Sequence, residues 1–512
     1  MKMSDRLRIE RLSCRFGPES TEALHDICLT VRPGEFVLLT GRSGCGKSAL
    51  IRCGSGLIPR VFPGRVSGAI QLNGRPLATL RTWEIAEHVG VTFQDPDHQL
   101  FTRTIEDEAA FGPENLGLPQ PEVAERVEQA LRLTGLWGIR RRLTAALSFG
   151  QKRRAGIAGI LALGPRLLLM DEPASVLDEE SARSILGNVA RIAAAHGGSV
   201  VVAEHRIGYV LEFATRLIVM QGGSIVYHGN PRAAMDGRFC ARYGLRPPVG
   251  NPMGRARFVC QGAHMTDLAL TARGVCFSYP DCQRSYGHRG PVLADVDLDV
   301  AASTATVIEG PNGSGKTTLL KVLAGLLQPT SGTVHRCGNN QRRSRGSGVA
   351  YVGHQPAYLF RCSQVERELD SWLAPEARQN STAYHLTELL DLGHVLTRHP
   401  LALSEGESRR LAIAAALAAQ PQVLILDEPS VGFDGYHLDC LLDALERYVA
   451  AGGALVVASN DPDLLCRMPA CAIRLGAAAG GPQKIRERPQ RGQSTGQHSG
   501  IPQSLESPPR LL

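Results

Sequence analysis

Two short stretches of this chain have the residue types needed to bind phosphate groups. GRSGCGKS spans residues 41–48 and GPNGSGKT spans residues 310–317, so both fit the pattern G-x-x-x-x-G-K-[ST]. Glycines let the backbone curl so that its N–H groups point at phosphate oxygens, while the lysine reaches the outer phosphates and the hydroxyl holds Mg²⁺. The residues expected to contact nucleotide are Gly41, Ser43, Gly44, Gly46, Lys47 and Ser48, then Gly310, Asn312, Gly313, Gly315, Lys316, Thr317 and Thr318.

A pair of acidic residues follows an apolar run in each half of the chain. The run LLLMDE ends in Asp171 and Glu172, and the run VLILDE ends in Asp427 and Glu428. The first carboxylate can hold Mg²⁺ through water, and the second can orient and polarise an attacking water molecule. Phosphoryl transfer depends mostly on positioning and charge neutralisation, so these few groups can suffice. The alternative is a surface acidic pair that happens to follow a strand.

A serine and a glycine begin a helix-like stretch between each phosphate loop and its acidic pair, in the sequences LSFGQKRR and LSEGESRR. Such a helix start offers an anion a hydroxyl, backbone donors and a favourable dipole. Ser148 precedes Asp171 at the same spacing at which Ser404 precedes Asp427. This equal spacing argues against two unrelated capped helices.

The elements that must position these groups read as alternating strands and helices. Apolar strand-like runs precede both phosphate loops, and further runs cover residues 200–205 and 454–459. Alternation of strands and helices predicts a mainly parallel sheet in each half. Ligands of such sheets bind at the carboxyl ends of the strands, which is where the polar motifs fall.

Composition limits the classes of protein that the chain can be. A length of 512 residues with 43% hydrophobic and 21% charged residues suits a globular protein of two or more domains. The net charge of +7 is modest, and the sequence lacks the clustered Lys and Arg that are typical of nucleic-acid binding. No nucleic-acid partner is therefore expected. The 13 cysteines have no C-x-x-C pairs, which predicts a reduced, cytosolic setting. No signal peptide or membrane-spanning run is expected.

The repeated motifs divide the chain into two domains. We expect the first domain at residues 5–238, a Pro-, Gly- and Arg-rich linker at 239–266, and the second domain at 267–476. Residues 477–512 are polar with almost no aliphatic pattern, which predicts a disordered tail.

On these motifs the chain resembles tandem ATP-binding cassette (ABC) ATPases, whose signature LSGGQ is similar to LSFGQ and LSEGE. The resemblance covers both domains and leaves only the linker and the tail. It implies an α/β fold of two P-loop NTPase cassettes, each with a mainly parallel sheet core, an antiparallel β part and a helical signature subdomain. It also implies ATP hydrolysis, with ATP and Mg²⁺ as cofactors.

In that family two cassettes pack head to tail, and each ATP lies between one phosphate loop and the other cassette's signature. The resemblance thus implies that both cassettes pair within this one chain. Site one would combine Lys47, Ser48, Asp171 and Glu172 with Ser404 and Gly406. Site two would combine Lys316, Thr317, Asp427 and Glu428 with Ser148, Gly150 and Gln151.

Other family positions match residue by residue. Gln94 and Gln355 match the glutamine that senses Mg²⁺ and the attacking water. The implied Mg²⁺ ligands are Ser48, Gln94 and Asp171 in site one, and Thr317, Gln355 and Asp427 in site two. Tyr279 matches the aromatic residue that stacks on adenine, and Phe16 is a weaker match that a core position would explain equally well. Asp178 and Asp434 match the loop that crosses between cassettes.

The last catalytic position differs between the halves. His205 in AEHR matches the family histidine that contacts the γ-phosphate, but the second half reads ASND and places Asn460 there. Asparagine can form hydrogen bonds but cannot carry a proton or a positive charge. We therefore expect site one to turn over and site two to hydrolyse slowly or mainly bind ATP, unless Asn460 substitutes adequately. Glu405 and Glu407 bring acid near the γ-phosphate of site one, which predicts weaker binding there.

The segment FQDPDHQLFTRTIEDEAAFGPENLGLP at 93–119 resembles the corresponding segment of energy-coupling factor (ECF) transporter ATPases. Those ATPases drive uptake of vitamins and of cobalt or nickel ions, with a transmembrane energising subunit and a small membrane substrate-binding subunit. The resemblance implies a place at the cytoplasmic face of the membrane. It also implies that Asp95 to Phe101 and Pro356 to Phe360 contact the membrane partner, although a polar loop entering a helical subdomain would look similar.

Three other classes share parts of this pattern. A tandem ATPase of a sugar-type importer has the same chemistry, but segment 93–119 disfavours it. A tandem cassette protein acting on ribosomes usually has a long, charged helical linker, unlike the Pro- and Gly-rich linker here. A DNA-repair cassette protein would need large inserts and zinc-binding cysteine pairs, and this sequence has neither. The transported cargo is not readable from this chain.

Overall fold

The structure is a computed structural model of the full chain. It describes residues 5–16, 22–94, 96, 99–175, 177–195, 197–248, 268–279, 291–336, 348–373, 382–468 and 471–475. Asp95, most of the expected linker and the expected tail at 477–512 lie outside the described residues.

The first half contains a six-stranded sheet in the order β10-β9-β3-β8-β7-β6. All neighbours in it are parallel except β9 and β10. The strand bounds are β3 Phe36–Gly41, β6 Val89–Thr92, β7 Leu167–Asp171, β8 Ser199–Ala203, β9 Arg216–Gln221 and β10 Ser224–Gly229. Every residue of β3, β7 and β8 is buried, as expected for central strands with both faces covered.

An antiparallel sheet in the order β2-β1-β4-β5 lies beside this core. Its bounds are β1 Leu7–Arg15, β2 Leu24–Val31, β4 Arg65–Leu72 and β5 Arg75–Pro76. The helices of the first half are α1 Lys47–Gly54, α2 Leu57–Arg60, α3 Thr82–Ala86, α4 Ile105–Asn115, α5 Gln120–Leu133, α6 Phe149–Leu163, α7 Glu179–Ala195 and α8 Gly237–Tyr243. Helices α4, α5 and α6 share an apolar cluster of their own and form a separate helical part.

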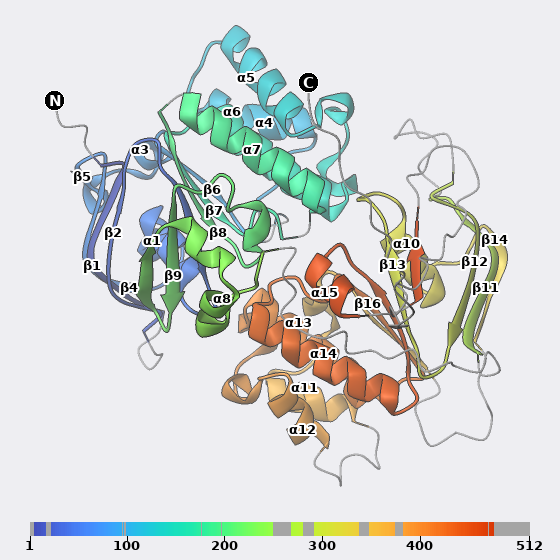
Figure 1. The fold of residues 1–512 in the computed structure, drawn as a ribbon. Coiled ribbons are helices and arrows are strands. Elements are labelled where there is room, and N and C mark those ends of the chain that lie inside the picture. The colour runs from blue at the N-terminus through green and yellow to red at the C-terminus, as the bar shows by residue number, and fades with distance from the viewer. Residues whose placement is uncertain are drawn as a thin grey trace, which may run out of the picture.

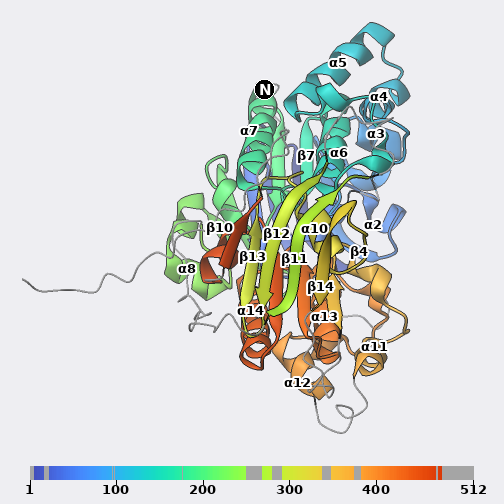
Figure 2. The same cartoon turned by 90° about the vertical axis from the view of Figure 1, so that its right-hand side faces the viewer.

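The second half repeats this plan with a five-stranded, all-parallel sheet in the order β15-β16-β17-β13-β18. Its bounds are β13 Ala305–Glu309, β15 Val349–Val352, β16 Val423–Asp427, β17 Ala454–Ala458 and β18 Cys471–Arg474. The antiparallel strands are β11 Leu268–Phe277, β12 Leu293–Ala301 and β14 Ser331–Arg336; Figure 2 shows them side by side at the face turned to the viewer. The helices are α10 Lys316–Leu323, α11 Val365–Trp372, α12 Thr382–Leu389, α13 Glu405–Ala418, α14 Gly435–Ala450 and α15 Pro462–Arg467.

The two halves are arranged in opposite directions. The helical part α4–α6 of the first half and helices α11 and α12 of the second half lie at opposite ends of the molecule (Figure 1). The predicted α/β fold is confirmed, since each half has a parallel core sheet, an antiparallel sheet and a helical part. Within the described ranges, no helix is both long and apolar enough to cross a bilayer.

Candidate nucleotide sites between the two halves

The first glycine-rich stretch forms the turn between β3 and α1. Gly44 and Gly46 have φ of 76° and 102°, which side chains with a Cβ rarely adopt. A Cβ on Gly46 would lie 2.5 Å from the backbone oxygen of Ala23, so the tight turn also excludes a side chain. The Lys47 ammonium lies inside the loop and donates to the carbonyl oxygen of Gly41 at 3.0 Å. The loop is therefore a curled cradle with a cation at its centre and a helix N-terminus at its base.

The second stretch repeats this geometry between β13 and α10. Gly313 and Gly315 have φ of 85° and 93°. The Lys316 ammonium donates to the carbonyl oxygen of Gly310 at 2.7 Å. Burial lowers the pKa of Lys316, while the carboxylate of Glu428 opposes that shift. Both loops can therefore present backbone donors and a lysine to a triphosphate.

The aspartates at the ends of β7 and β16 have oxygens that suit a divalent cation. Asp171 and Asp427 are buried, and Oδ1 of each forms no hydrogen bond with the described residues, although His354 Nε2 lies 3.5 Å from Asp427 Oδ1. Burial, with Glu172 nearby, raises the pKa of Asp171 to about 6, and a hydrogen bond from Ser48 acts in the opposite direction. No cluster of three or more acidic, His or Cys ligands occurs in the described part of the chain. A hard cation here would therefore share one carboxylate with hydroxyl and phosphate oxygens, which is how Mg²⁺ is commonly held.

The second acid of the first half is paired with a histidine. His205 Nε2 lies 3.3 Å from Glu172 Oε1, and both side chains are buried. Burial acts to raise the pKa of Glu172, but His205, Lys47 and Arg153 outweigh it and lower the pKa to about 2. Glu172 also has a φ of 47°, a left-handed conformation that is uncommon for glutamate and points to a constrained site. Glu172 is thus held ionised beside His205, whose own pKa is lowered by burial and by Lys47, while Glu172 opposes that shift.

The second acid of the second half has a different environment. Glu428 accepts from the Ser459 hydroxyl at 2.9 Å and from the backbone N–H of Asn460 at 3.0 Å. The Asn460 amide donates instead to Asn312 Oδ1 of the second phosphate loop at 3.0 Å. Burial raises the pKa of Glu428, although Lys316 and His354 oppose the rise. The pKa values of the two glutamates are therefore shifted in opposite directions.

The helix that starts at each signature faces the phosphate loop of the other half. A Cβ placed on Gly150 would lie 3.5 Å from Asn312 Nδ2, and one placed on Gly406 would lie 3.9 Å from Ser43 Oγ. Ser148 and Ser404 cap α6 and α13 through hydrogen bonds from the third helical residue. The structure thus places each signature glycine beside the phosphate loop of the other half, the arrangement that the family resemblance implies.

The loop after Glu428 makes the direct hydrogen bonds to the first phosphate loop. The backbone N–H of Ser43 donates to Asp434 Oδ2 at 2.8 Å, and the Ser43 hydroxyl donates to the Gly432 carbonyl at 3.0 Å. Asp178, its counterpart, accepts from the backbone and hydroxyl of Ser181 within its own half. Its charge still influences Lys316. The two crossing loops are therefore not equivalent.

Two buried arginines hold the segments that carry the predicted glutamines. Arg153 of α6 donates to the carbonyl oxygens of Phe93 and Gln94. Arg409 of α13 donates to the carbonyl oxygen of His354, the residue before Gln355. Sequence reasoning assigned no role to either arginine. The signal was the matched pair of basic residues that ends LSFGQKRR and LSEGESRR.

The signature acids of the second half have donors close by. Glu405 Oε1 lies 3.6 Å from the guanidinium of Arg409. Glu407 accepts from the backbone N–H of Ser404 and pairs with His394 at 3.1 Å. Much of the charge expected to repel the γ-phosphate is therefore directed at neighbouring donors.

The aromatic candidates for adenine stacking are both accessible. Tyr279 is 37% exposed and packs edge-on against Phe277, and its hydroxyl lies 3.2 Å from Thr318 Oγ1. Phe16 is 42% exposed, so the alternative that it is a core residue is wrong. Both rings are free to offer a face to a planar base.

The fold and these two loops define a duplicated P-loop nucleotide-binding protein. The family model described as ABC transporter matches residues 24–175 and 293–431, and the chain belongs to this family. It is an ATP-binding protein with the ATPase activity of that family.

Relatives of the chain agree with this assignment. A putative ABC transporter ATP-binding protein of Methanosarcina mazei is 31% identical, over 90% of this chain and 85% of that protein. The putative HMP/thiamine import ATP-binding protein YkoD of Bacillus subtilis is 31% identical, over 90% and 88%. Among structures, cbiO1 of Clostridium perfringens is 31% identical over 47% of this chain and 94% of its own, with a TM-score of 0.41. An RNase-L inhibitor shares the fold, with 19% identity, coverage of 93% and 90%, and a TM-score of 0.60.

Proposed function

We propose that this chain is the ATPase subunit of an ECF-type importer, bound at the cytoplasmic face of the membrane. Its partners would be a transmembrane energising subunit and a small membrane substrate-binding subunit. The observation that carries the proposal is an open apolar groove of about 570 Å³ in the second half. Leu359 and Phe360 line it, and they belong to the segment expected to contact the membrane subunit. The other wall includes Trp372 and the small residues of α13, so a partner helix could approach closely.

The first half offers exposed aromatic side chains at the matching segment. Phe101 is 66% exposed and packs edge-on against Phe111, with ring centroids 4.5 Å apart. Exposed aromatic residues are enriched at protein interfaces. A partner that contacts both segments would be moved when the two halves close and open.

Turnover is proposed at site one, where Glu172 and His205 meet. Mg²⁺, held by Ser48 and Asp171, would neutralise charge on the phosphates. Glu172 is ionised and can orient a water molecule towards the γ-phosphate, while His205 fixes the position of its carboxylate. Lys47 and the loop N–H groups would bind the phosphates, and Ser404 and Gly406 would complete the site from the other half. Site two would bind ATP with slower hydrolysis.

The relative YkoD is named as an HMP/thiamine import protein, which supports a vitamin-type cargo for the assembly. Cobalt or nickel ions are the other cargo class. We would co-express the chain with the membrane proteins encoded beside its gene and reconstitute the purified complex in vesicles. ATP-dependent uptake of a thiamine precursor or of Co²⁺, lost on Phe360→Glu but kept on Tyr384→Glu, is the expected result. Tyr384 is an exposed residue of α12 outside the groove. Co-sedimentation with ribosomes and no membrane complex would contradict the proposal.

A further inference from the structure

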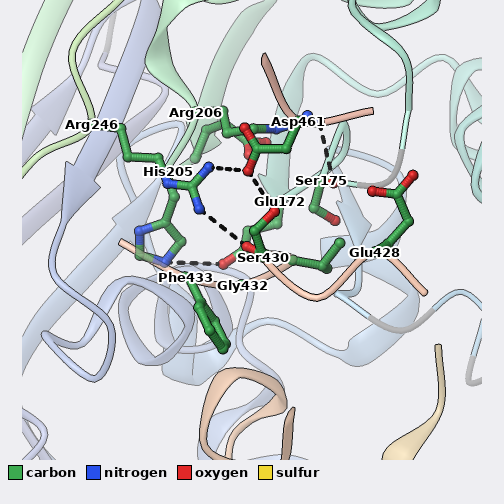
Figure 3. A pocket seen from close by; sticks show the side chains of 12 residues that line it. Glu172, Ser175, His205, Arg206, Arg246, Glu428, Ser430, Gly432, Phe433 and Asp461 are labelled. Carbon is green, nitrogen blue, oxygen red and sulfur yellow. Dashed lines mark hydrogen bonds and ion pairs between the residues drawn. The ribbon is translucent and has the colours of Figure 1, made fainter. Parts of the chain in front are cut away.

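An arginine from the end of the first half is buried in the second half. Arg246 follows α8 closely, in the segment expected to be linker, and its side chain is 1% exposed. Its Nη1 donates to Asp461 Oδ2 at 2.6 Å, and its Nη2 donates to the Ser430 carbonyl at 3.1 Å (Figure 3). A single guanidinium thus joins two segments of the other half, and both bonds are charge-assisted.

The carbonyl that Arg246 holds has a counterpart in the first half. Ser430 is the second residue after Glu428, just as Ala174 is the second residue after Glu172. The Ala174 carbonyl accepts from Arg206 Nη2 at 2.7 Å, and the same nitrogen donates to two further carbonyls of that loop. An arginine therefore holds the start of each crossing loop at the same backbone oxygen.

The source of the arginine differs between the halves. In the first half it is Arg206, the residue directly after His205. In the second half the residue after Asn460 is Asp461, which can only accept. Arg246 fills the missing place from the other half, and Asp461 anchors it. Burial acts to raise the pKa of Asp461, but Arg246 and Arg206 lower it, so the anchor is ionised.

This contact leads directly to site one. The loop that begins at Ser430 continues to Gly432 and Asp434, which bind Ser43 of the first phosphate loop. Arg246 also lines a small cavity together with the Glu172 and His205 pair (Figure 3). The cavity measures about 10 Å³, close to the space that one water molecule needs. A shift of Arg246 would therefore disturb both the crossing loop and the wall beside the catalytic pair.

We propose that Arg246 is a positioning residue for site one, acting from the connecting segment on the crossing loop at 429–434. It substitutes for the counterpart of Arg206, which the second half lacks because Asp461 stands at that position. Through this contact, the packing of the two halves against each other sets the geometry of site one. The inference rests on the proposed assignment of turnover to Glu172 and His205. The connecting segment would then contribute to ATP hydrolysis as well as joining the two halves.

The first test measures steady-state ATPase kinetics of the full chain with site two disabled by Glu428→Gln. In this background, Arg246→Met is expected to lower kcat about tenfold and to change KM for ATP less than about twofold, because Arg246 touches no nucleotide-binding residue. Arg242→Gln is the matched control, since Arg242 is an exposed arginine of the same segment. Equal kcat for the two variants would overturn the proposal, as would a change confined to KM.

A second variant separates positioning from folding. Arg246→Met leaves the Asp461 carboxylate buried without its partner, which can destabilise the fold by itself. The double variant Arg246→Met/Asp461→Asn removes both charges, so its melting temperature should return towards that of the parent. The proposal expects kcat of the double variant to stay about tenfold low, because the Ser430 carbonyl then keeps only its bond from the Phe433 backbone N–H and no longer has the Arg246 contact. Recovery of kcat together with melting temperature would show a structural role only and overturn it.

A conservative variant gives a third test, in which the positive charge at position 246 is kept. Arg246→Lys keeps one charge for Asp461 but cannot make the two-pronged contact to the carbonyl as well. Melting should be unchanged and kcat should fall about threefold. Wild-type kcat for this variant would count against the proposal. Wild-type activity of Glu172→Gln would instead reject the assignment of site one, which is a separate failure.

Discussion

His205 Nε2 and Glu172 Oε1 lie 3.3 Å apart in a buried pocket, and the described residues of the second half contain no equivalent pair. There, Glu428 is bound by the backbone N–H of Asn460 and the hydroxyl of Ser459. His205, Lys47 and Arg153 outweigh burial and lower the pKa of Glu172, whereas burial raises the pKa of Glu428. The two halves have the same fold and phosphate loops, but their glutamates differ in proton affinity.

The first prediction concerns how much each of the two sites contributes to the ATPase rate. Glu172→Gln should lower the ATPase rate about 100-fold or more, because it removes the ionised group that would orient water. Glu428→Gln should lower it less than about threefold, because that site already contributes little. Steady-state phosphate release by each variant measures both values. Equal losses for the two variants would show that the sites share turnover.

The second prediction restores the missing histidine. Asn460→His in the Glu172→Gln background should raise the residual rate about tenfold, since a histidine there can pair with Glu428 as His205 pairs with Glu172. Single-turnover hydrolysis with excess enzyme isolates this step. A rate unchanged by the substitution would mean that Asn460 already serves adequately.

The third prediction concerns the arginine that holds the first glutamine segment. Arg153→Gln should lower kcat about tenfold with a smaller change in KM, because Arg153 fixes the Phe93 and Gln94 carbonyls and touches no phosphate-loop residue. Arg141→Gln, at an exposed position, is the control. A matching loss in both variants would point to a general charge effect.

The fourth prediction concerns the cation. Removal of divalent ions with a chelator should abolish hydrolysis, and added Mg²⁺ should restore it. Asp171→Asn should raise the Mg²⁺ concentration for half-maximal rate about tenfold, since a neutral amide binds a hard cation more weakly than a carboxylate does. An unchanged Mg²⁺ requirement would remove Asp171 from the cation site.

The fifth prediction is a pH dependence of stability from Glu204. Burial, with Glu172 nearby, raises the pKa of Glu204 from 4.5 to about 7. Because the folded-state value is raised, the stabilising contribution of the protonated form is complete below about pH 4.5 and is lost as pH rises through about 7. Glu204→Gln should therefore be more stable than wild type at pH 8 by on the order of 3 kcal/mol.

Thermal melts at pH 5 and pH 8 provide the measurement for Glu204. The gap between Glu204→Gln and wild type should widen from the lower to the higher pH. Glu212→Gln is the control, because Glu212 is only half-buried on the surface of the same half. A gap that is constant with pH would assign the effect to packing instead of ionisation.

Local sequence predicted the chemistry well because each motif is a contiguous pattern. Glycine spacing alone places Lys47 and Lys316 within curled loops, and unbroken apolar runs before Asp171 and Asp427 predict buried strands that end in acids. The alternation of such strands with helices was enough to predict the α/β fold of both halves. The sequence does not decide whether Phe16 stacks on adenine or belongs to the core, because an isolated aromatic residue shows no periodicity.

The sequence by itself determined that this chain has two phosphate loops and two acidic pairs. It also determined that the histidine of the first half, His205, is replaced by Asn460 in the second half. Only the tertiary structure decided that Arg246 pairs with Asp461 and that the pKa values of Glu172 and Glu428 move in opposite directions. The physical reason is distance along the chain. Burial and charge neighbours of a residue come from segments far apart in sequence, and no local pattern records which of them meet when the two halves pack.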